Sequence, residues 1–255
     1  MIEYRCGESA VICADSTDPD VAAHITREYG HAALVIADPP YGNIIPERWD
    51  RIAATQQEYA QWMRDWTGVW VEGLLDGGAM YVWGGYGVVN FRPFQEYICT
   101  VERDVPVEVA NLITWGKKRA RGIQWGYLQT REDVVYLVKG NHKKPRAFTV
   151  PLLDKERGYA GYNPKYPAKS KFLRRTSVWT DITEILRGKV HPTEKPARLY
   201  EVIVAASSHP GDLVVDPFAG SGVTALVARE LGRRFVVVEQ DPEYVELILK
   251  RLSIP

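Results

Sequence analysis

The 255-residue sequence predicts a doubly wound α/β fold with a mostly parallel sheet. Short apolar runs rich in branched residues, which are typical of buried strands, alternate with longer stretches whose apolar residues recur every three or four positions. Several runs end at an acidic residue, and one continues into a glycine-rich turn before a helix. Ligands of such sheets bind beyond the carboxyl ends of the strands. We therefore expect the functional residues at the strand ends.

The individual elements follow from these patterns. We predict strands at 9–14, 34–37, 79–83, 109–115, 133–138, 212–216 and 235–238, and helices at 20–29, 57–75, 94–102, 199–207 and 224–231. The helix at 57–75 carries a stripe of aromatic residues, including Tyr59, Trp62, Trp66 and Trp70, which we interpret as core packing. From Gly140 to about 179 the periodicity fails, which predicts a long irregular insertion of the kind that has a function or is disordered.

The composition is that of a globular protein and argues against membrane-spanning, secreted and metal-binding classes. Apolar residues (45%) and charged residues (25%) match globular averages, and no run of about 18 apolar residues could span a membrane. The N-terminus lacks the pattern of a secretion signal. The three cysteines, Cys6, Cys13 and Cys99, have no C-x-x-C spacing, so we expect neither disulfides nor a bound metal. We expect a cytoplasmic protein.

The net charge of zero hides a basic region. Between Lys117 and Arg175 the sequence has 16 Lys and Arg against 4 Asp and Glu. Basic residues interleaved with aromatic ones suit contacts to phosphates and bases of nucleic acid, although a solvated surface loop would have the same composition. The predicted DNA contacts are Lys143, Lys144, Arg146, Lys169, Lys171, Arg174 and Arg175. We expect Arg174 or Arg175 to contact a base edge.

The strand at 34–37 is followed by Asp38-Pro39-Pro40-Tyr41. Proline has no N–H, so the carbonyls of Asp38 and Pro39 stay available as acceptors. The Asp38 carboxylate and the Pro39 carbonyl could each accept a hydrogen of an aromatic amine, while the Tyr41 ring covers the face of the base. The alternative is an ordinary strand followed by a Pro-Pro turn.

A second unit near the C-terminus suits an adenosyl ligand. The strand ending at Asp216 leads into a turn that contains Phe218, Gly220 and Gly222, then a helix and a strand ending at Glu239. The glycines let a ligand approach the backbone, and the acid can accept from two ribose hydroxyls. The turn lacks the third glycine of the dinucleotide pattern, which favours a ligand without a pyrophosphate. Asp15 also follows a strand.

Three motifs in this order resemble the beta-class DNA amino-methyltransferases, which use S-adenosylmethionine: the sequence 38–41, His-Pro-Thr-Glu-Lys-Pro at 191–196, and 216–222. The resemblance covers nearly the whole chain and implies the Rossmann-like fold of S-adenosylmethionine-dependent methyltransferases, encoded by a bacterium, an archaeon or a phage. It implies a catalytic half at 1–139, a target-recognition insertion at 140–180 and a cofactor-binding half at 181–255.

The same resemblance assigns roles to residues. Asp38, Pro39, Pro40 and Tyr41 would form the catalytic loop on a flipped-out base. For the cofactor, the resemblance implies a methionine pocket around Phe218, Gly220 and Gly222 with Asp216 near the amino group, Glu239 on the ribose, Asp15 on the adenine, and further contacts to the methionine end from His191, Thr193 and Lys195.

The implied reaction is methylation of adenine N6 in double-stranded DNA. Cytosine N4 methylation uses the same geometry, but in the resembling family a Ser-Pro-Pro-Tyr motif is more usual for it, so Asp38 favours adenine. Methylation of RNA or protein, and DNA binding without catalysis, are the remaining alternatives. The sequence leaves open the target sequence, a homodimer and a cognate restriction endonuclease.

Overall fold

The computed structural model describes residues 1–41, 55–84, 87–121, 127–156, 172–185 and 194–254. Most of the strands belong to one nine-stranded sheet of order β1-β2-β11-β10-β3-β4-β6-β5-β9. Their bounds are β1 (Ile2–Cys6), β2 (Ser9–Cys13), β3 (Ala32–Ala37), β4 (Leu74–Gly84), β5 (Val107–Arg121), β6 (Gln129–Lys139), β9 (Val178–Trp179), β10 (Leu213–Asp216) and β11 (Arg234–Glu239). The strands from β2 to β4 are all parallel, whereas β6 is antiparallel to both β4 and β5.

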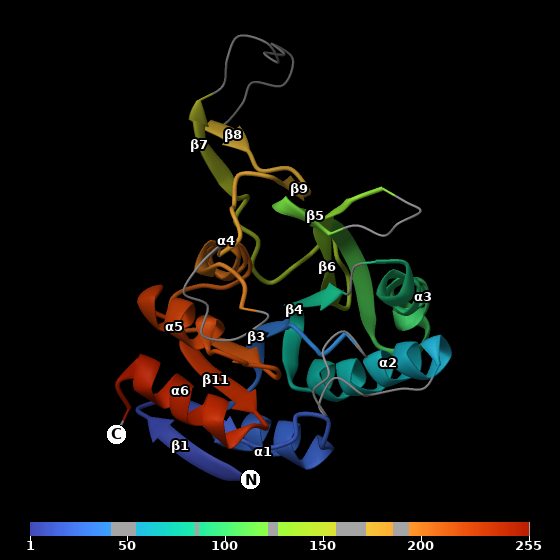
Figure 1. The fold of residues 1–255 in the computed structure, drawn as a ribbon. Helices are drawn as coiled ribbons and strands as arrows, with labels where there is room; N and C mark the ends of the chain where they lie inside the picture. The colour runs from blue at the N-terminus through green and yellow to red at the C-terminus, as the bar shows by residue number, and fades with distance from the viewer. Residues whose placement is uncertain (42–54, 85–86, 122–126, 157–171, 186–193, 255) are drawn as a thin grey trace.

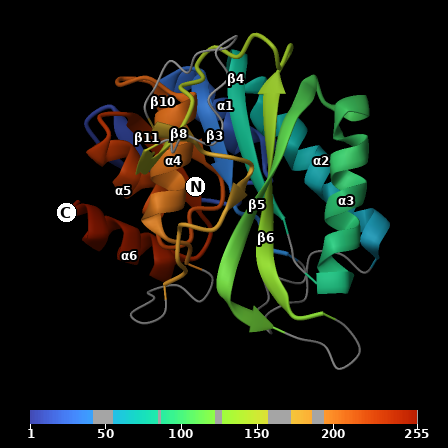
Figure 2. The same cartoon turned by 90° about the horizontal axis from the view of Figure 1, so that it is seen from above.

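Helices cover both faces of this sheet, as Figures 1 and 2 show. One face carries α1 (Pro19–Tyr29), α2 (Gln56–Glu72) and α3 (Gly87–Asp104), and the other carries α4 (Ala197–Ser207), α5 (Val223–Glu230) and α6 (Pro242–Leu252). Successive residues of β3 point to opposite faces, so Val35 packs with the first group and Leu34 and Ile36 with the second. The predicted doubly wound α/β fold is confirmed.

Short polar sequences fix where several helices begin. Asp18 caps α1 by accepting from the backbone N–H of Asp20 (2.9 Å), and Asp241 caps α6 in the same way. At α2, Thr55 and Glu58 form a reciprocal capping box. Each cap satisfies N–H groups that have no partner within the helix.

The C-terminal strands are inserted into the middle of the sheet. β10 pairs with β3 on one side and β11 on the other, and β11 then pairs with β2. The glycine-rich turn after β10 therefore lies beside the loop after β3, although the two are about 180 residues apart in sequence.

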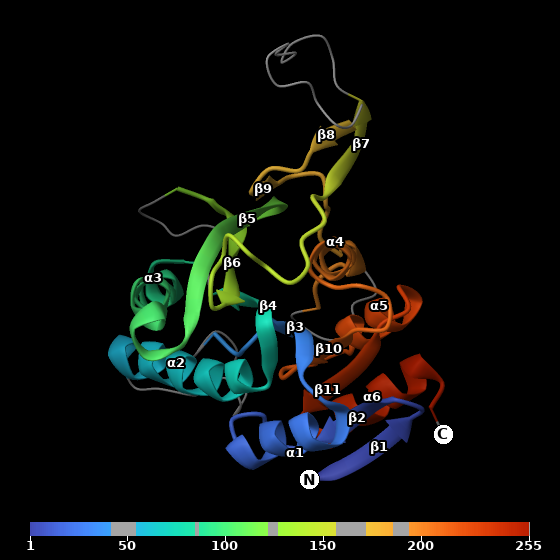
Figure 3. The same cartoon turned by 180° about the vertical axis from the view of Figure 1, so that it is seen from behind.

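The insertion at 140–180 is irregular over much of its described length, but it contains three short strands that the sequence did not predict. β7 (Leu152–Glu156) and β8 (Phe172–Arg174) form an antiparallel pair that projects from the body beyond α4 in Figures 1 and 3. β9 adds two residues to the outer edge of the large sheet. Strands this short carry too few residues to show an alternation, so periodicity misses them. β1 and α6 were also not predicted.

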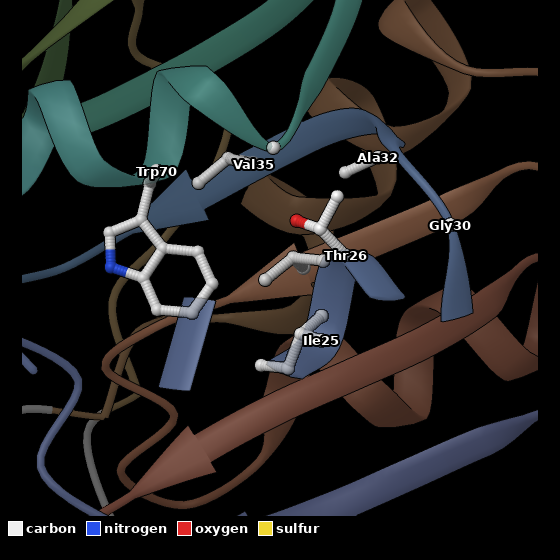
Figure 4. Close-up of a pocket in the computed structure, with 8 residues that line it drawn as sticks. Ile25, Thr26, Gly30, Ala32, Val35 and Trp70 are labelled. Atoms are coloured by element: carbon white, nitrogen blue, oxygen red, sulfur yellow. The ribbon is translucent and has the colours of Figure 1, made fainter. Parts of the chain in front are cut away.

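The small cavity in Figure 4 lies between α1, β3 and α2. Its volume is about 10 Å³, enough for roughly one water molecule, and its lining includes Ile25, Val35 and Trp70. It lies near Gly30 and Gly73, where β3 and β4 begin. A nucleotide could not fit there. None of the described helices is long and apolar enough to cross a membrane.

Candidate active site

Acidic residues follow neighbouring strands at the carboxyl edge of the sheet. Asp15, Glu239, Asp216 and Asp38 stand at or just after the ends of β2, β11, β10 and β3, which are adjacent in this order. The strand registers, such as Glu239 opposite Cys13, keep these ends level. The structure thus brings together the four acidic residues predicted for the catalytic loop and for the cofactor.

In the catalytic loop, both oxygens of Asp38 are bound. The Tyr41 hydroxyl donates to Oδ1 (2.9 Å), and Nζ of Lys195 bonds Oδ2 and also donates to the Tyr41 hydroxyl (3.0 Å). Burial and the nearby Asp38 carboxylate raise the pKa of Tyr41 well above its ordinary value, so its hydroxyl keeps the proton that it donates. Asp38 is therefore held as a hydrogen-bond acceptor at the end of β3.

Lys195 belongs to a buried group of charges. Its side chain is 4% exposed, and Nζ lies 3.4 Å from Glu132 Oε2 and 4.9 Å from the centre of the Trp83 ring. Glu132 also binds Lys117. Burial lowers the pKa of Lys195, but the carboxylates of Asp38 and Glu132 outweigh it, so the pKa lies above its ordinary value and the group is an ammonium ion.

The resemblance assigned Lys195 to the methionine end of the cofactor, whereas the structure brings it to Asp38. Sequence reasoning missed Glu132 and Lys117 altogether. Glu132 precedes the apolar run of β6, and only the antiparallel direction of that strand puts its first residues at the same edge as Asp38. The sequence alone does not give the direction of β6, so it does not show that Glu132 lies near Asp38.

The aromatic stripe of α2 supports both loops. The Tyr59 hydroxyl donates to the Pro40 carbonyl (2.7 Å), and the Trp66 ring packs edge-on against Phe218 at 5.1 Å between centroids. Tyr59 and Trp66 are 6% and 1% exposed, so the prediction of core packing is confirmed. The stripe also fixes the catalytic loop and the glycine-rich turn to one helix.

Asp216 is buried at the start of the glycine-rich turn. It accepts from the Phe218 backbone N–H (2.9 Å) and the Thr224 hydroxyl (2.5 Å), and it is 3% exposed. Burial raises its pKa to about 7, with further contributions from the carboxylates of Asp38 and Glu239. An ammonium group of a ligand placed here would favour the ionised form.

Glu239 closes the turn from the next strand. Its carboxylate accepts from the backbone N–H groups of Gly220 (2.8 Å) and Asp241 (2.9 Å), and burial raises its pKa. A carboxylate oxygen has more than one lone pair, so both oxygens can still accept from ribose hydroxyls. On β2, the exposed Asp15 accepts from the backbone N–H (2.9 Å) and hydroxyl (2.7 Å) of Thr17. These acceptors fit the ribose and adenine of an adenosyl cofactor.

The structure gives a reason for glycine at 222 that the sequence did not show. Its φ of 75° lies in the left-handed region, and a Cβ there would stand 2.8 Å from the Ile248 side chain of α6. The glycine is thus fixed by the turn and by the packing of α6. That its missing side chain also makes room for the ligand stays a prediction.

Glu194 and Lys195 connect the two loops. Arg251 of α6 pairs with Glu194 (2.8 Å) and donates to the Ser221 carbonyl in the glycine-rich turn (2.9 Å). Lys195, the next residue, holds Asp38. The sequence predicted neither Glu194 nor Arg251, and the predicted His191 and Thr193 lie outside the described residues.

Three predicted DNA contacts lie at the edge of the sheet opposite Asp38. β6 is antiparallel to β4, so Lys143, Lys144 and Arg146, which follow it, lie where the parallel strands begin. The Arg146 backbone N–H donates to the Gly77 carbonyl (2.8 Å), and its guanidinium binds Asp212, just before β10, through two bonds of 2.7 Å. This position argues against contact between these residues and DNA whose base is at Asp38.

The other predicted DNA contacts lie in β8, directly after β8, or outside the described residues. Arg175 is bound to Asp181 through two hydrogen bonds (2.5 and 2.7 Å), its side chain is 3% exposed, and it lies over the Trp179 ring. This packing explains Arg175 as a structural residue. Arg174 is exposed at the end of β8, while Lys169 and Lys171 lie outside the described residues.

The fold and the site define a class of enzyme. Asp216 and Glu239, which suit an adenosyl cofactor, lie beside Asp38, which accepts a hydrogen bond from a nitrogen. This arrangement suits the transfer of a group from such a cofactor to an amine. Residues 32–250 match the family model N6_N4_Mtase, described as DNA methylase. The chain belongs to this family and is an S-adenosylmethionine-dependent DNA methyltransferase. Among the described residues no group of three His, Cys, Asp or Glu could hold a metal.

Known proteins resemble this chain in sequence and in fold. The chain is 28% identical over 235 residues to the type II methyltransferase M2.DpnII of Streptococcus pneumoniae, covering 86% of this chain and 82% of that protein. Its fold resembles the M1.HpyAVI–SAM complex (22% identity, TM-score 0.63, covering 95% and 98% of the two chains). It also resembles the cytosine-N4-specific PvuII DNA methyltransferase (21% identity, TM-score 0.70, covering 97% and 87%).

Proposed function

We propose that this chain transfers a methyl group from S-adenosylmethionine to the exocyclic N6 of an adenine in a specific sequence of double-stranded DNA. The observation that carries this proposal is the Asp38 carboxylate, which already binds an ammonium nitrogen from Lys195 beside the cofactor residues Asp216 and Glu239. An aromatic amine makes the same kind of donor contact.

The chain's own residues would make the amine reactive. An exocyclic amine is a weak nucleophile because its lone pair is delocalised into the ring. Hydrogen bonds from the amine to Asp38 and to the Pro39 carbonyl favour a tetrahedral nitrogen and stabilise the positive charge that develops on it. The cofactor supplies a methyl group that is already activated as a sulfonium. Holding the amine in line with that methyl is a proximity effect worth several kcal/mol.

The target base has to leave the duplex, because its amine is inaccessible in the stack. The Tyr41 ring would cover the base, and the hydrogen bond from its hydroxyl to Asp38 supports this role. Cytosine N4 methylation is the second candidate, because the geometry suits either amine. The aspartate at position 38, where serine is more usual for cytosine enzymes, favours adenine.

The DNA would lie across the carboxyl edge of the sheet. There β5 and β6 carry the exposed Lys118, Arg119 and Arg131, and Tyr127 is 97% exposed. Arg174 on the projecting β7–β8 pair is a further basic contact. We propose these residues as the described part of the DNA surface, with β7–β8 as part of the target-recognition segment. Because M2.DpnII is named a type II methyltransferase, a cognate restriction endonuclease is also proposed.

Transfer from tritiated S-adenosylmethionine tests the substrate class. We expect label in duplex DNA, and we expect unlabelled duplex DNA to compete while RNA and protein do not. Labelling of RNA or protein in preference to DNA would contradict the proposal, as would DNA binding without any transfer.

A further inference from the structure

A cluster of four charged side chains lies beside the catalytic loop. It contains the carboxylates of Asp38 and Glu132 and the ammonium groups of Lys117 and Lys195. The side chains of Glu132 and Lys195 are 7% and 4% exposed. A buried charge is costly unless it is paired, so the ammonium of Lys195 has to keep at least one carboxylate partner at all times.

Lys195 binds the carboxylate that we propose for the target amine. Asp38 Oδ1 is taken by the Tyr41 hydroxyl and Oδ2 by the ammonium of Lys195. Each oxygen keeps a further lone pair, so an amine that donates to Asp38 enters in competition with these two donors. Lys195 is the donor with a second carboxylate within reach.

Glu132 offers that second position. Its Oε1 binds Lys117, whereas its Oε2 is buried and, among the described residues, makes no hydrogen bond although Lys195 Nζ is 3.4 Å away. A movement of less than about 1 Å would bring the pair to the ~2.8 Å of a charged hydrogen bond. The Trp83 ring, 4.9 Å from Nζ, stabilises the cation beside both carboxylates.

We infer that Lys195 is a positioning residue that changes partners, bound to Asp38 in the base-free enzyme and passed to Glu132 when the target amine enters. This inference rests on the proposed function, since the amine of the base is the competitor. The exchange keeps every buried charge paired. It also makes Asp38 selective, because a base without an exocyclic amine cannot replace the ammonium.

Binding of two duplexes tests the exchange. The duplexes are identical except that the target base carries or lacks its exocyclic amine, and S-adenosylhomocysteine is present so that no transfer occurs. The measured quantity is the ratio of the two dissociation constants, for the wild-type enzyme, Lys195→Met and Glu132→Gln.

The two variants should change this ratio in opposite directions. In Lys195→Met, Asp38 has lost its cation and the amine becomes its replacement donor, so the preference for the amine-bearing duplex should rise about tenfold. In Glu132→Gln, Lys195 has no second carboxylate and stays on Asp38, so the preference should fall. A purely structural role would not produce opposite shifts.

Lys139→Met is the matched control. Lys139 is half-buried, and its Nζ donates to the Leu74 carbonyl (2.8 Å), where β4 begins, far along the strand from the site. The ratio of the two dissociation constants for Lys139→Met should equal that of the wild-type enzyme. Calorimetric binding of S-adenosylmethionine checks that each variant is folded.

An unchanged ratio in folded Lys195→Met and Glu132→Gln would overturn the inference. If Lys195→Met does not fold, Glu132→Gln decides alone. A reduced preference for the amine-bearing duplex would then support the exchange, and an unchanged preference would refute it. Failure of the proposed function has a different signature, because the wild-type enzyme would then transfer no methyl group to DNA at all.

Discussion

The glycine-rich turn and the catalytic loop follow adjacent strands of one sheet, but they are held in different ways. In the turn, Asp216 and Glu239 accept mainly from nearby backbone N–H groups and from Thr224. In the catalytic loop, Asp38 is held by side chains, one of which comes from Lys195, 157 residues away in sequence. The difference teaches that the carboxylates of the turn are held by contacts within residues 216–241, whereas the Asp38 carboxylate depends on the assembled sheet that brings Lys195 to it.

If the two regions have separate tasks, removing Asp38 should abolish transfer without affecting cofactor binding. Asp38→Ala should lower the rate of methyl transfer at least about 100-fold, because one preorganised acceptor is lost. Transfer is measured with tritiated cofactor and cofactor affinity by calorimetry. Asp76→Ala, an exposed carboxylate near the start of β4, is the control. Substantial residual transfer would refute the assignment of Asp38.

The turn should respond to pH in a way that the catalytic loop does not. Because burial raises the pKa of Asp216 to about 7, this carboxyl is largely protonated at pH 6, and a bound ammonium favours its ionised form. Cofactor affinity should therefore rise roughly tenfold from pH 6 to pH 8. Calorimetry across this range measures it, and Asp216→Asn should remove the dependence. An equal rise in cofactor affinity in Asp216→Asn would show that another group causes the pH dependence.

Asp216 should also make the free energy of unfolding depend on pH. In the unfolded chain an aspartic acid has a pKa of about 3.9, so between roughly pH 4 and 7 the folded protein holds a proton that the unfolded chain has released. The contribution of Asp216 to the free energy of unfolding should fall as the pH rises through this window. Urea unfolding at several pH values should show a smaller fall in Asp216→Asn.

Tyr59 links α2 to the catalytic loop, so its hydroxyl should matter to that loop alone. Tyr59→Phe leaves the Pro40 carbonyl without this donor and should lower the free energy of unfolding by about 1–2 kcal/mol. Urea unfolding measures the loss. Transfer should slow while cofactor affinity stays unchanged. Weakened cofactor binding in Tyr59→Phe would instead show that the two loops are not held independently.

The smallest expected effect separates the two edges of the sheet. Lys118 lies at the carboxyl edge and Lys144 at the opposite one, and both are exposed. Lys118→Gln should lower the slope of log K for DNA against log salt concentration by about 0.9, as expected when one phosphate contact is lost. Lys144→Gln should leave the slope unchanged. The reverse result would return the DNA surface to the residues predicted from charge alone.

Sequence patterns were sufficient for the local features. The apolar run before Asp38 and the strand–turn–helix around Gly222 predicted the strand ends and the cofactor turn, because these depend on residues close in the chain. The positions of Glu132 and Arg146 could not be predicted, because both follow from the reversed direction of β6. The contact of Lys195 with Asp38 needed the sheet order.

The central claim is that Asp38 presents an adenine amine to the cofactor's methyl group, and the modified bases of host DNA test it most directly. DNA from cells expressing the wild-type chain or Asp38→Ala is sequenced by a method that detects base modification. We predict N6-methyladenine in one sequence context with the wild-type chain and none with Asp38→Ala. N4-methylcytosine in the wild-type sample, or the same modified adenine in both samples, would contradict the claim.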